Sequence, residues 1–291
     1  MSKESINIRE LLLDQNIRLP ACPAIFLRLM DILQDEKAEM KDLVKVVSAD
    51  PALTLEIIRV ANSPFYGASR QIKSIGEAAM RLGFRDIWAI ASAIKGKEMF
   101  DFSRKNWTLL DTVNWEHGLR VAAAARVVAE RTNPRFVEFF FTAGLLHDIG
   151  KVLLLHVDRR QYPVLCENGA VHGEALVERE REAYGTEHAA IGNELLLHWS
   201  LPDMLSHLVK GHHTLLPNNL PSKELGPRLL ALSNEIAHCW KPSASEKGQV
   251  VFERELPPPL VAHANLTPDT LPAVAKAYQH EYRKLKEITI A

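Results

Sequence analysis

Residues 136–155 read FVEFFFTAGLLHDIGKVLLL, an almost continuously apolar run that is interrupted by His147, Asp148 and Lys151. A segment that is apolar on every side is typical of a helix buried in a protein core. Burial of an imidazole and a carboxylate among leucines is costly unless a hydrogen bond or a metal ion compensates for the lost water. The run therefore predicts a central core helix, and it marks His147 and Asp148 as candidate site residues.

The segments on both sides of this run have the periodicity of helices. Apolar residues recur at three- and four-residue spacing over 43–47 and 53–60, as they do on the buried face of a helix. Between these segments Asp50 and Pro51 form a typical helix start. Residues 113–131 are rich in alanine, the best helix former. Since strand-like alternation is nearly absent, the sequence predicts an all-α protein, a multi-helix bundle.

Two changes of composition divide the chain. Residues 101–106 are mostly polar, and residues 242–268 hold three consecutive prolines, which cannot continue a helix. The final helix is expected to start after a cap at Thr267 and to pack back onto the rest of the protein. We predict three parts: an N-terminal helical lobe over 1–105, a helical lobe that bears the histidines over 106–241, and a loop with a final helix over 242–291.

The composition excludes several classes of protein. The chain has 291 residues, of which 47% are hydrophobic and 24% charged, so it can bury a substantial core and is not a disordered protein. No uncharged apolar run reaches the roughly 18 residues of a membrane-spanning helix, and the first residues lack the apolar stretch of a signal peptide. Three dispersed cysteines indicate reduced thiols. We therefore expect a cytoplasmic protein that does not contact a membrane.

The charge pattern gives no support for nucleic-acid binding. The formal net charge is −1, which supplies no attraction to a polyanion. Arg126, Arg131 and Arg135 are basic, but acidic residues lie among them, and we interpret them as a solvated helix face. Nucleic acid is therefore not expected among the partners.

Twelve histidines are many for a chain of this length. Besides His147, four lie near the ends of predicted helices: His117, His188, His212 and His213. Antiparallel packing of those helices could bring them together with Asp148. Neutral imidazole and carboxylate are ordinary ligands of zinc, iron and manganese, so the group predicts a metal site. The alternative for an isolated His–Asp pair is a hydrogen-bonded pair without a metal.

The other seven histidines have no companion pattern. We interpret them as surface residues or as core residues with a hydrogen-bond partner: His156, His172, His198, His207, His238, His263 and His280.

From about residue 19 to 240 the chain resembles the HDOD domain, a bacterial signalling module related to the HD phosphohydrolase superfamily. The resemblance is carried by DPALT (50–54), ANS (61–63), FYG (65–67) and HDIGK (147–151). The first three are specific to this family, whereas HDIGK alone indicates only the broader superfamily. The resemblance implies a regulatory role with signalling proteins as partners.

The resemblance also implies a set of site residues. His117 matches the first histidine of the catalytic HD proteins and His147-Asp148 matches their central pair. His188 and His212 or His213 match the additional histidines that bind a second ion. Lys151 matches a lysine near the substrate phosphate. The implied cofactor is one or two divalent ions of iron, manganese, zinc or magnesium, and in an active enzyme Asp148 and Lys151 would be catalytic.

Two departures from the catalytic pattern count against hydrolysis. The closing aspartate is replaced by Asn234, a neutral amide that supplies no charge to balance a divalent cation. His212-His213 is followed by Thr214, where the related HD-GYP phosphodiesterases carry a glutamate and then a GYP segment. We therefore expect a non-catalytic signalling module that acts through protein or ligand binding, with a nucleotide as one candidate ligand. The alternative is a metal-dependent phosphohydrolase or phosphodiesterase acting on a nucleotide or cyclic dinucleotide.

Overall fold

The computed structural model describes residues 10, 22–67, 70–100, 108–213, 225–242, 250–252, 256, 266–267 and 269–290. Within these residues the fold is helical, and the one sheet pairs β1 (Trp240–Pro242) with β2 (Val250–Phe252) in antiparallel register. The predicted all-α class is confirmed. The polar boundary at 101–106 and most of 242–268 lie outside the described residues, and the division into three parts stays a prediction.

The helices have the following bounds: α2 (Ala24–Gln34), α3 (Met40–Ser48), α4 (Pro51–Ala61), α5 (Ile75–Phe100), α6 (Leu109–Thr132), α7 (Val137–Leu146), α8 (Ile149–Val157), α9 (Tyr162–Leu165), α10 (Gly173–Tyr184), α11 (His188–His198), α12 (Asp203–Lys210), α13 (Leu225–Cys239) and α15 (Leu271–Ile290). Short 3-10 turns lie at η1 (Pro64–Tyr66), η2 (Pro134–Phe136) and η3 (Glu167–Gly169).

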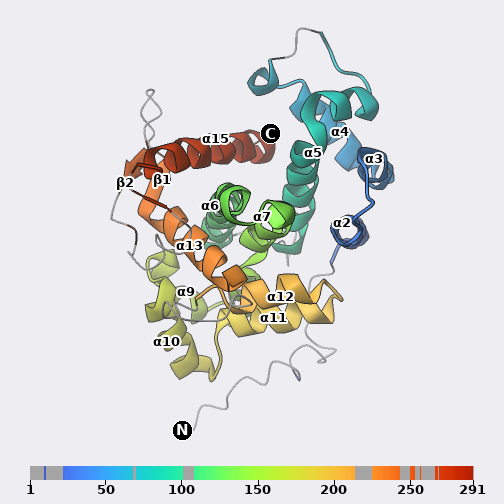
Figure 1. Cartoon of the computed structure of the whole chain (residues 1–291). Helices are drawn as coiled ribbons and strands as arrows, with labels where there is room; N and C mark the ends of the chain where they lie inside the picture. Colours follow the sequence, from blue (N-terminus) through green and yellow to red (C-terminus); the bar gives the residue numbers. More distant parts are fainter. Residues whose placement is uncertain are drawn as a thin grey trace.

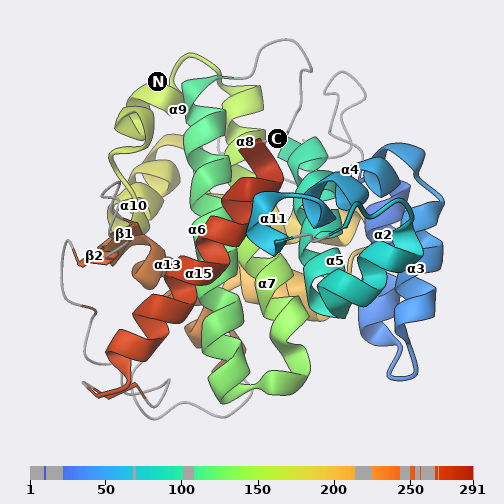
Figure 2. The ribbon, with the colours of Figure 1, turned by 90° about the horizontal axis from the view of Figure 1, so that it is seen from above.

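The centre of the molecule is the pair α6 and α7, which run side by side and are joined through η2 (Figure 2). Their close approach needs a glycine. A Cβ atom on Gly144 would lie 2.8 Å from the backbone of Ala122, closer than packed atoms come. Helices α13 and α15 pack on α6, while α11 and α12 lie across the other end of the bundle (Figure 1).

The predicted single core helix over 136–155 is wrong in one respect. The structure has two helices, α7 and α8, which are separated at His147 and Asp148. The break redirects the chain so that α8 packs against α11, where a Cβ atom on Gly150 would lie 1.9 Å from the carbonyl oxygen of His188. Residues 134–157 are apolar enough to cross a membrane, but 89% of their most apolar window is buried inside the protein, as in a core helix.

The N-terminal helices follow their predicted signals. Asp50 caps α4 by accepting a hydrogen bond from the Leu53 amide at 3.0 Å, which confirms the start signal. After α4, the Asn62 side chain exchanges two hydrogen bonds with the backbone of Ile72, at 2.8 and 2.9 Å. Gly83 has φ +75° and interrupts the regular geometry of α5. Helices α2–α5 pack on one another and form one side of the molecule (Figure 2).

The C-terminal helix starts later than predicted. The helix begins at Leu271 and is preceded by a turn at 269–270, and the Thr267 carbonyl accepts from the amides of Thr270 and Leu271 at 2.9 and 3.0 Å. The helix lies across α6 and touches α5 (Figure 2), which confirms that it packs back onto the rest of the chain.

The interpretation of Arg126 as part of a solvated face is wrong. Its side chain is only 1% exposed. It donates to Glu138 at 2.6 Å, to Glu281 at 3.2 Å and to the carbonyl of Arg85 at 3.2 Å. The one guanidinium therefore joins α5, α6, α7 and α15. No local sequence pattern indicates this burial, because the partners of Arg126 lie on other helices.

Candidate metal centre

The break between α7 and α8 places Asp148 at the centre of the predicted site. Its side chain is buried, and its two carboxylate oxygens face different groups of residues. Oδ2 lies 3.3 Å from His147 Nε2, 4.0 Å from His117 Nε2 and 2.7 Å from the ammonium of Lys151. On this side, the Asn234 amide oxygen on α13 lies 2.8 Å from His117 Nε2.

The second carboxylate oxygen faces the other predicted histidines. Oδ1 of Asp148 lies 3.3 Å from His188 Nε2 and 3.7 Å from His212 Nε2. His213 Nε2 lies 2.8 Å from His188 Nε2. The structure therefore brings all the predicted residues together and divides them between the two oxygens of one carboxylate. Their role as metal ligands stays a prediction.

Hydrogen bonds to the ring atoms Nδ1 set which nitrogen of each histidine is free. His147 Nδ1 donates to the Gly144 carbonyl at 2.8 Å, and His212 Nδ1 donates to the Val209 carbonyl at 2.6 Å. His188 Nδ1 donates to the Glu180 carboxylate at 2.6 Å. A proton on Nδ1 leaves Nε2 with its lone pair, which is the atom that each ring turns toward Asp148.

Several of these inward atoms lack a hydrogen bond. Among the described residues, His147 Nε2, His212 Nε2 and Asp148 Oδ1 are buried with no hydrogen-bond partner. Lone pairs that face one another in a buried site are costly, and a cation between them removes the cost. The donor set of imidazoles and a carboxylate therefore fits a divalent transition metal.

The charges of the site agree with this fit. Burial lowers the pKa of His117 and of His212 well below the usual value, so both rings are neutral. Burial alone would raise the pKa of Asp148, but the neighbouring His147 and Lys151 outweigh it and hold the pKa well below its usual value. Asp148 is therefore an ionised ligand.

The two sides of Asp148 are not equally suited to an ion. On the Oδ2 side the ammonium of Lys151 already neutralises the carboxylate, and Asn234 supplies no charge. On both sides three ligand atoms lie within 4.8 Å of one another: those of His117, His147 and Asp148 on the Oδ2 side, and those of His188, His212 and His213 on the Oδ1 side, where no lysine among the described residues competes for the carboxylate. The Oδ1 side is therefore the better metal site.

Glu180 was not among the predicted residues, although it supports the Oδ1 side. Its side chain is fully buried, and it accepts from the His188 amide at 2.8 Å and from the Tyr162 hydroxyl at 2.7 Å as well as from the His188 ring. Burial would raise the pKa of Glu180, but His188 outweighs it and lowers the pKa below its usual value. Together with Asp148 it places two negative charges beside one divalent site.

Replacing Glu180 is expected to weaken metal binding without removing a ligand. In Glu180→Gln the carboxylate that orients His188 is lost, and the affinity for the metal should fall by about 10- to 100-fold. Competition with a chromophoric chelator measures this change. Glu178→Gln, at an exposed position on the same helix, is the matched control. Equal affinities in both variants would limit Glu180 to a structural role.

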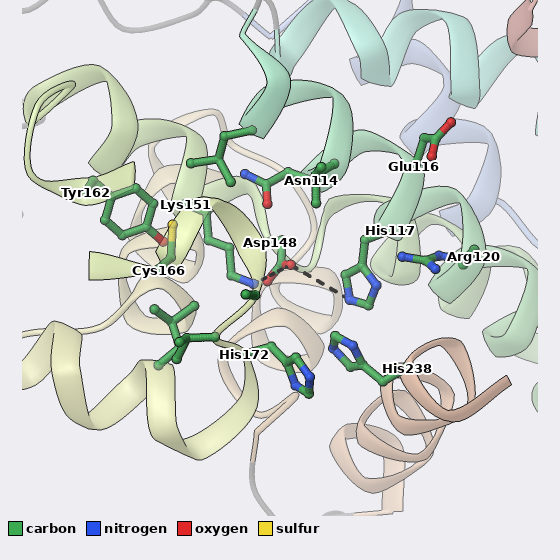
Figure 3. A pocket seen from close by; sticks show the side chains of 16 residues that line it. Asn114, Glu116, His117, Arg120, Asp148, Lys151, Tyr162, Cys166, His172 and His238 are labelled. Atoms are coloured by element: carbon green, nitrogen blue, oxygen red, sulfur yellow. Dashed lines mark hydrogen bonds and ion pairs between the residues drawn. The ribbon is translucent and has the colours of Figure 1, made fainter. Parts of the chain in front are cut away.

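A cavity of about 590 Å³ opens beside this site (Figure 3). It is lined by His117, Asp148 and Lys151, which belong to the Oδ2 side, and by residues of α6, η3 and α10. Among its described lining residues, none of the three histidines of the Oδ1 side appears. A ligand in the cavity would thus meet Asp148 from the side that lacks the better metal site.

Two histidines that sequence reasoning set aside belong to this cavity. His172 and His238 line it (Figure 3), with their rings stacked at a centroid distance of 4.0 Å, and His238 lies 4.3 Å from the ring of His117. Burial and His172 lower the pKa of His238 to about 2. The spacing of four residues from Asn234 on one helix face could have indicated His238. No local pattern indicated His172.

The HDOD domain family matches residues 19–215 of the chain. An uncharacterized protein of Treponema pallidum (strain Nichols) is 22% identical over 198 residues, which are 68% of this chain and 38% of that protein. The chain thus spans less than half the length of this curated relative.

Solved structures have the same fold. An HDOD domain protein of unknown function from Geobacter sulfurreducens is 25% identical, with 93% of this chain and 95% of that chain covered and a TM-score of 0.62. A candidate phosphohydrolase from Shewanella amazonensis SB2B is 20% identical over 99% and 100% of the two chains, with a TM-score of 0.67. A candidate signal transduction protein from Marinobacter aquaeolei VT8 is 21% identical over 94% and 58%, with a TM-score of 0.66. The similarity to the last two structures shows a shared fold and nothing further.

Proposed function

Since the chain belongs to the HDOD family, we propose that it is a bacterial signalling module whose buried site holds one divalent metal ion and does not hydrolyse phosphate esters. The proposed ligands are His188, His212, His213 and Asp148 Oδ1, with Glu180 behind His188. The proposed ion contributes charge that holds four helix ends together. The expected partners of this module are other signalling proteins.

One observation carries the non-catalytic part of the proposal. The side of Asp148 that faces the cavity has a lysine on the carboxylate and an asparagine beside His117, at 2.7 and 2.8 Å. An ion on this side would have to share the Asp148 carboxylate with Lys151. The ion proposed on the Oδ1 side is separated from the cavity by Asp148 itself. It is therefore poorly placed to polarise a phosphoryl oxygen of a ligand in the cavity.

A chain of polar contacts supports a signalling role for the N-terminal helices. Tyr66, in the family-specific FYG stretch, donates to Asp86 at 3.0 Å, and Asp86 accepts from Lys284 of α15 at 2.8 Å. Lys284 donates to Glu281 at 2.7 Å, which accepts from Arg126 of α6. Because α6 also carries His117, a change at the cavity has a physical connection to the N-terminal side.

The second candidate function is metal-dependent phosphate ester hydrolysis. It is favoured by Lys151, which lines the cavity next to Asp148 and His117 and has N–H groups left to bind a phosphate. This candidate requires an ion on the Oδ2 side as well, where it would polarise the phosphoryl group and lower the pKa of a bound water.

Metal analysis of the purified protein tests the proposal. After growth with iron, manganese and zinc, mass spectrometry of the elements should find about one ion per chain, and His212→Ala should lose it. His207→Ala, at an exposed position on α12, should retain it. Phosphomonoesters, nucleotides and cyclic dinucleotides should not be turned over. Two ions per chain with turnover that Lys151→Met abolishes would favour the hydrolase, and absence of metal would contradict both.

A further inference from the structure

The face of α6 that lines the cavity carries a row of nitrogen-bearing side chains. Asn114, His117 and Arg120 follow one another at three-residue spacing, so their Cα atoms rise by about 4.5 Å each along the helix. Asn114 and Arg120 flank His117 on both sides (Figure 3). The row therefore extends well beyond the site around Asp148.

Two N–H groups in this row lack a partner. Asn114 is only 5% exposed, and its amide nitrogen is buried without a hydrogen bond among the described residues. The same is true of Nε of Arg120. A buried donor without an acceptor is costly, so both groups fit a ligand that brings acceptor atoms into the cavity.

The charges of the cavity select an anion. Arg120 and Lys151 are its cationic side chains. Of the two carboxylates among its described lining residues, Asp148 is paired with Lys151, and Glu116 is exposed and lies 3.8 Å from the ammonium of Lys286. The lining thus offers N–H donors to an anion and leaves little negative charge to repel it.

The rest of the lining suits a flat organic group. Leu110, Val113, Val171 and Leu176 provide apolar surface, and the stacked rings of His172 and His238 form part of the wall (Figure 3). The volume of about 590 Å³ lies within the range of small-molecule sites. An anionic group, a planar ring and acceptor atoms occur together in a nucleotide.

We propose that this cavity binds a nucleoside phosphate and that Asn114 and Arg120 are ligand-binding residues. The phosphate lies beside Lys151, the base lies among the apolar side chains near His172 and His238, and Asn114 and Arg120 donate to acceptor atoms on either side of His117. The inference rests on the proposed function, in which no ion occupies the Oδ2 side and the nucleotide is bound rather than hydrolysed.

Calorimetric titration of the full chain in its metal-loaded form tests this inference. The probes are AMP and GMP, with ribose 5-phosphate and inorganic phosphate as fragments that lack the base. At least one nucleotide should bind about tenfold more tightly than ribose 5-phosphate. Asn114→Leu and Arg120→Met should each weaken that nucleotide by about tenfold or more, the loss expected for one hydrogen bond to a charged group, with the metal content unchanged.

The controls separate this inference from the metal proposal. Arg131→Met, at an exposed position near the far end of α6, should bind the nucleotide as the wild type does. If Asn114→Leu does not fold, Asn114→Asp keeps the size of the side chain and removes its donor.

Nucleotide affinities within twofold of wild type in the Asn114 and Arg120 variants would overturn the inference. The same holds if ribose 5-phosphate binds as tightly as both nucleotides. Failure of AMP and GMP to bind the metal-loaded chain would overturn it too and leave the metal proposal standing. Absence of metal from the purified chain would overturn only the metal proposal.

Discussion

The substitution Asn234→Asp is expected to raise the metal content from about one ion per chain to two. The amide oxygen of Asn234 accepts a hydrogen bond from His117 Nε2 at 2.8 Å, so a carboxylate at this position would lie beside an imidazole on the Oδ2 side of Asp148. The new carboxylate adds the negative charge that the Oδ2 side lacks. Asp148 would then no longer have to balance the positive charges of both Lys151 and a second ion by itself. Elemental mass spectrometry after reconstitution with manganese or iron measures the stoichiometry.

The same variant is expected to gain a weak hydrolytic activity. With an ion on the cavity side, a phosphate ester beside Lys151 would contact the metal directly. Turnover of p-nitrophenyl phosphate and of AMP should rise from background in Asn234→Asp, and adding His117→Ala should abolish the gain. Asn133→Asp, at the C-terminal end of α6, is the control for an added carboxylate elsewhere. A stoichiometry that stays at one ion in Asn234→Asp would contradict the assignment of this residue as the missing ligand.

Arg126→Met is expected to lower the free energy of unfolding by about 3–5 kcal/mol, the usual cost of removing one partner of a buried ion pair. The guanidinium is 1% exposed and is bound to two carboxylates, Glu138 and Glu281. Its loss leaves Glu138, which is 9% exposed, as a buried charge without its main partner. Urea denaturation followed by circular dichroism measures the change. Arg131→Met, an exposed position on the same helix, should change stability by less than about 0.5 kcal/mol.

The loss in Arg126→Met should depend on pH. Burial raises the pKa of Glu138 above its usual value even though Arg126 lowers it, so removing Arg126 raises the pKa further. A carboxyl whose pKa is higher in the folded state than in the unfolded state destabilises the fold as pH rises through the folded pKa. The deficit of the variant should therefore shrink between pH 7.5 and pH 5.5. The double variant Arg126→Met/Glu138→Gln should recover part of the loss at pH 7.5; no recovery would show that packing, not charge, dominates.

The helical class and the start of α4 followed from the sequence because they depend on neighbours within one or two turns. The cap at Asp50 is of this kind. The final helix starts later than predicted because a turn at 269–270 precedes it. The break between α7 and α8 was also missed, since the run over 136–155 is almost continuously apolar and contains no proline.

The candidate site was predicted from residue chemistry, and its internal arrangement was not. His147 and Asp148 could be named because an imidazole and a carboxylate within an apolar run are visible in the sequence, and Asn234 was named from the resemblance to the catalytic HD proteins. Glu180 was missed because it meets His188 only where the chain turns between α10 and α11. His238 was missed because a histidine without companions gives no signal of the cavity that it lines.

By itself, the sequence determined the helical class of this protein, the family it belongs to, and the chemical types of the residues in its site. These follow from local periodicity and from the side chains that are present. Only the tertiary structure decided that the ligands divide between Oδ1 and Oδ2 of Asp148 and that Arg126 is buried at the junction of four helices. The physical reason is that both depend on distances of a few ångströms between helices that are far apart in the chain.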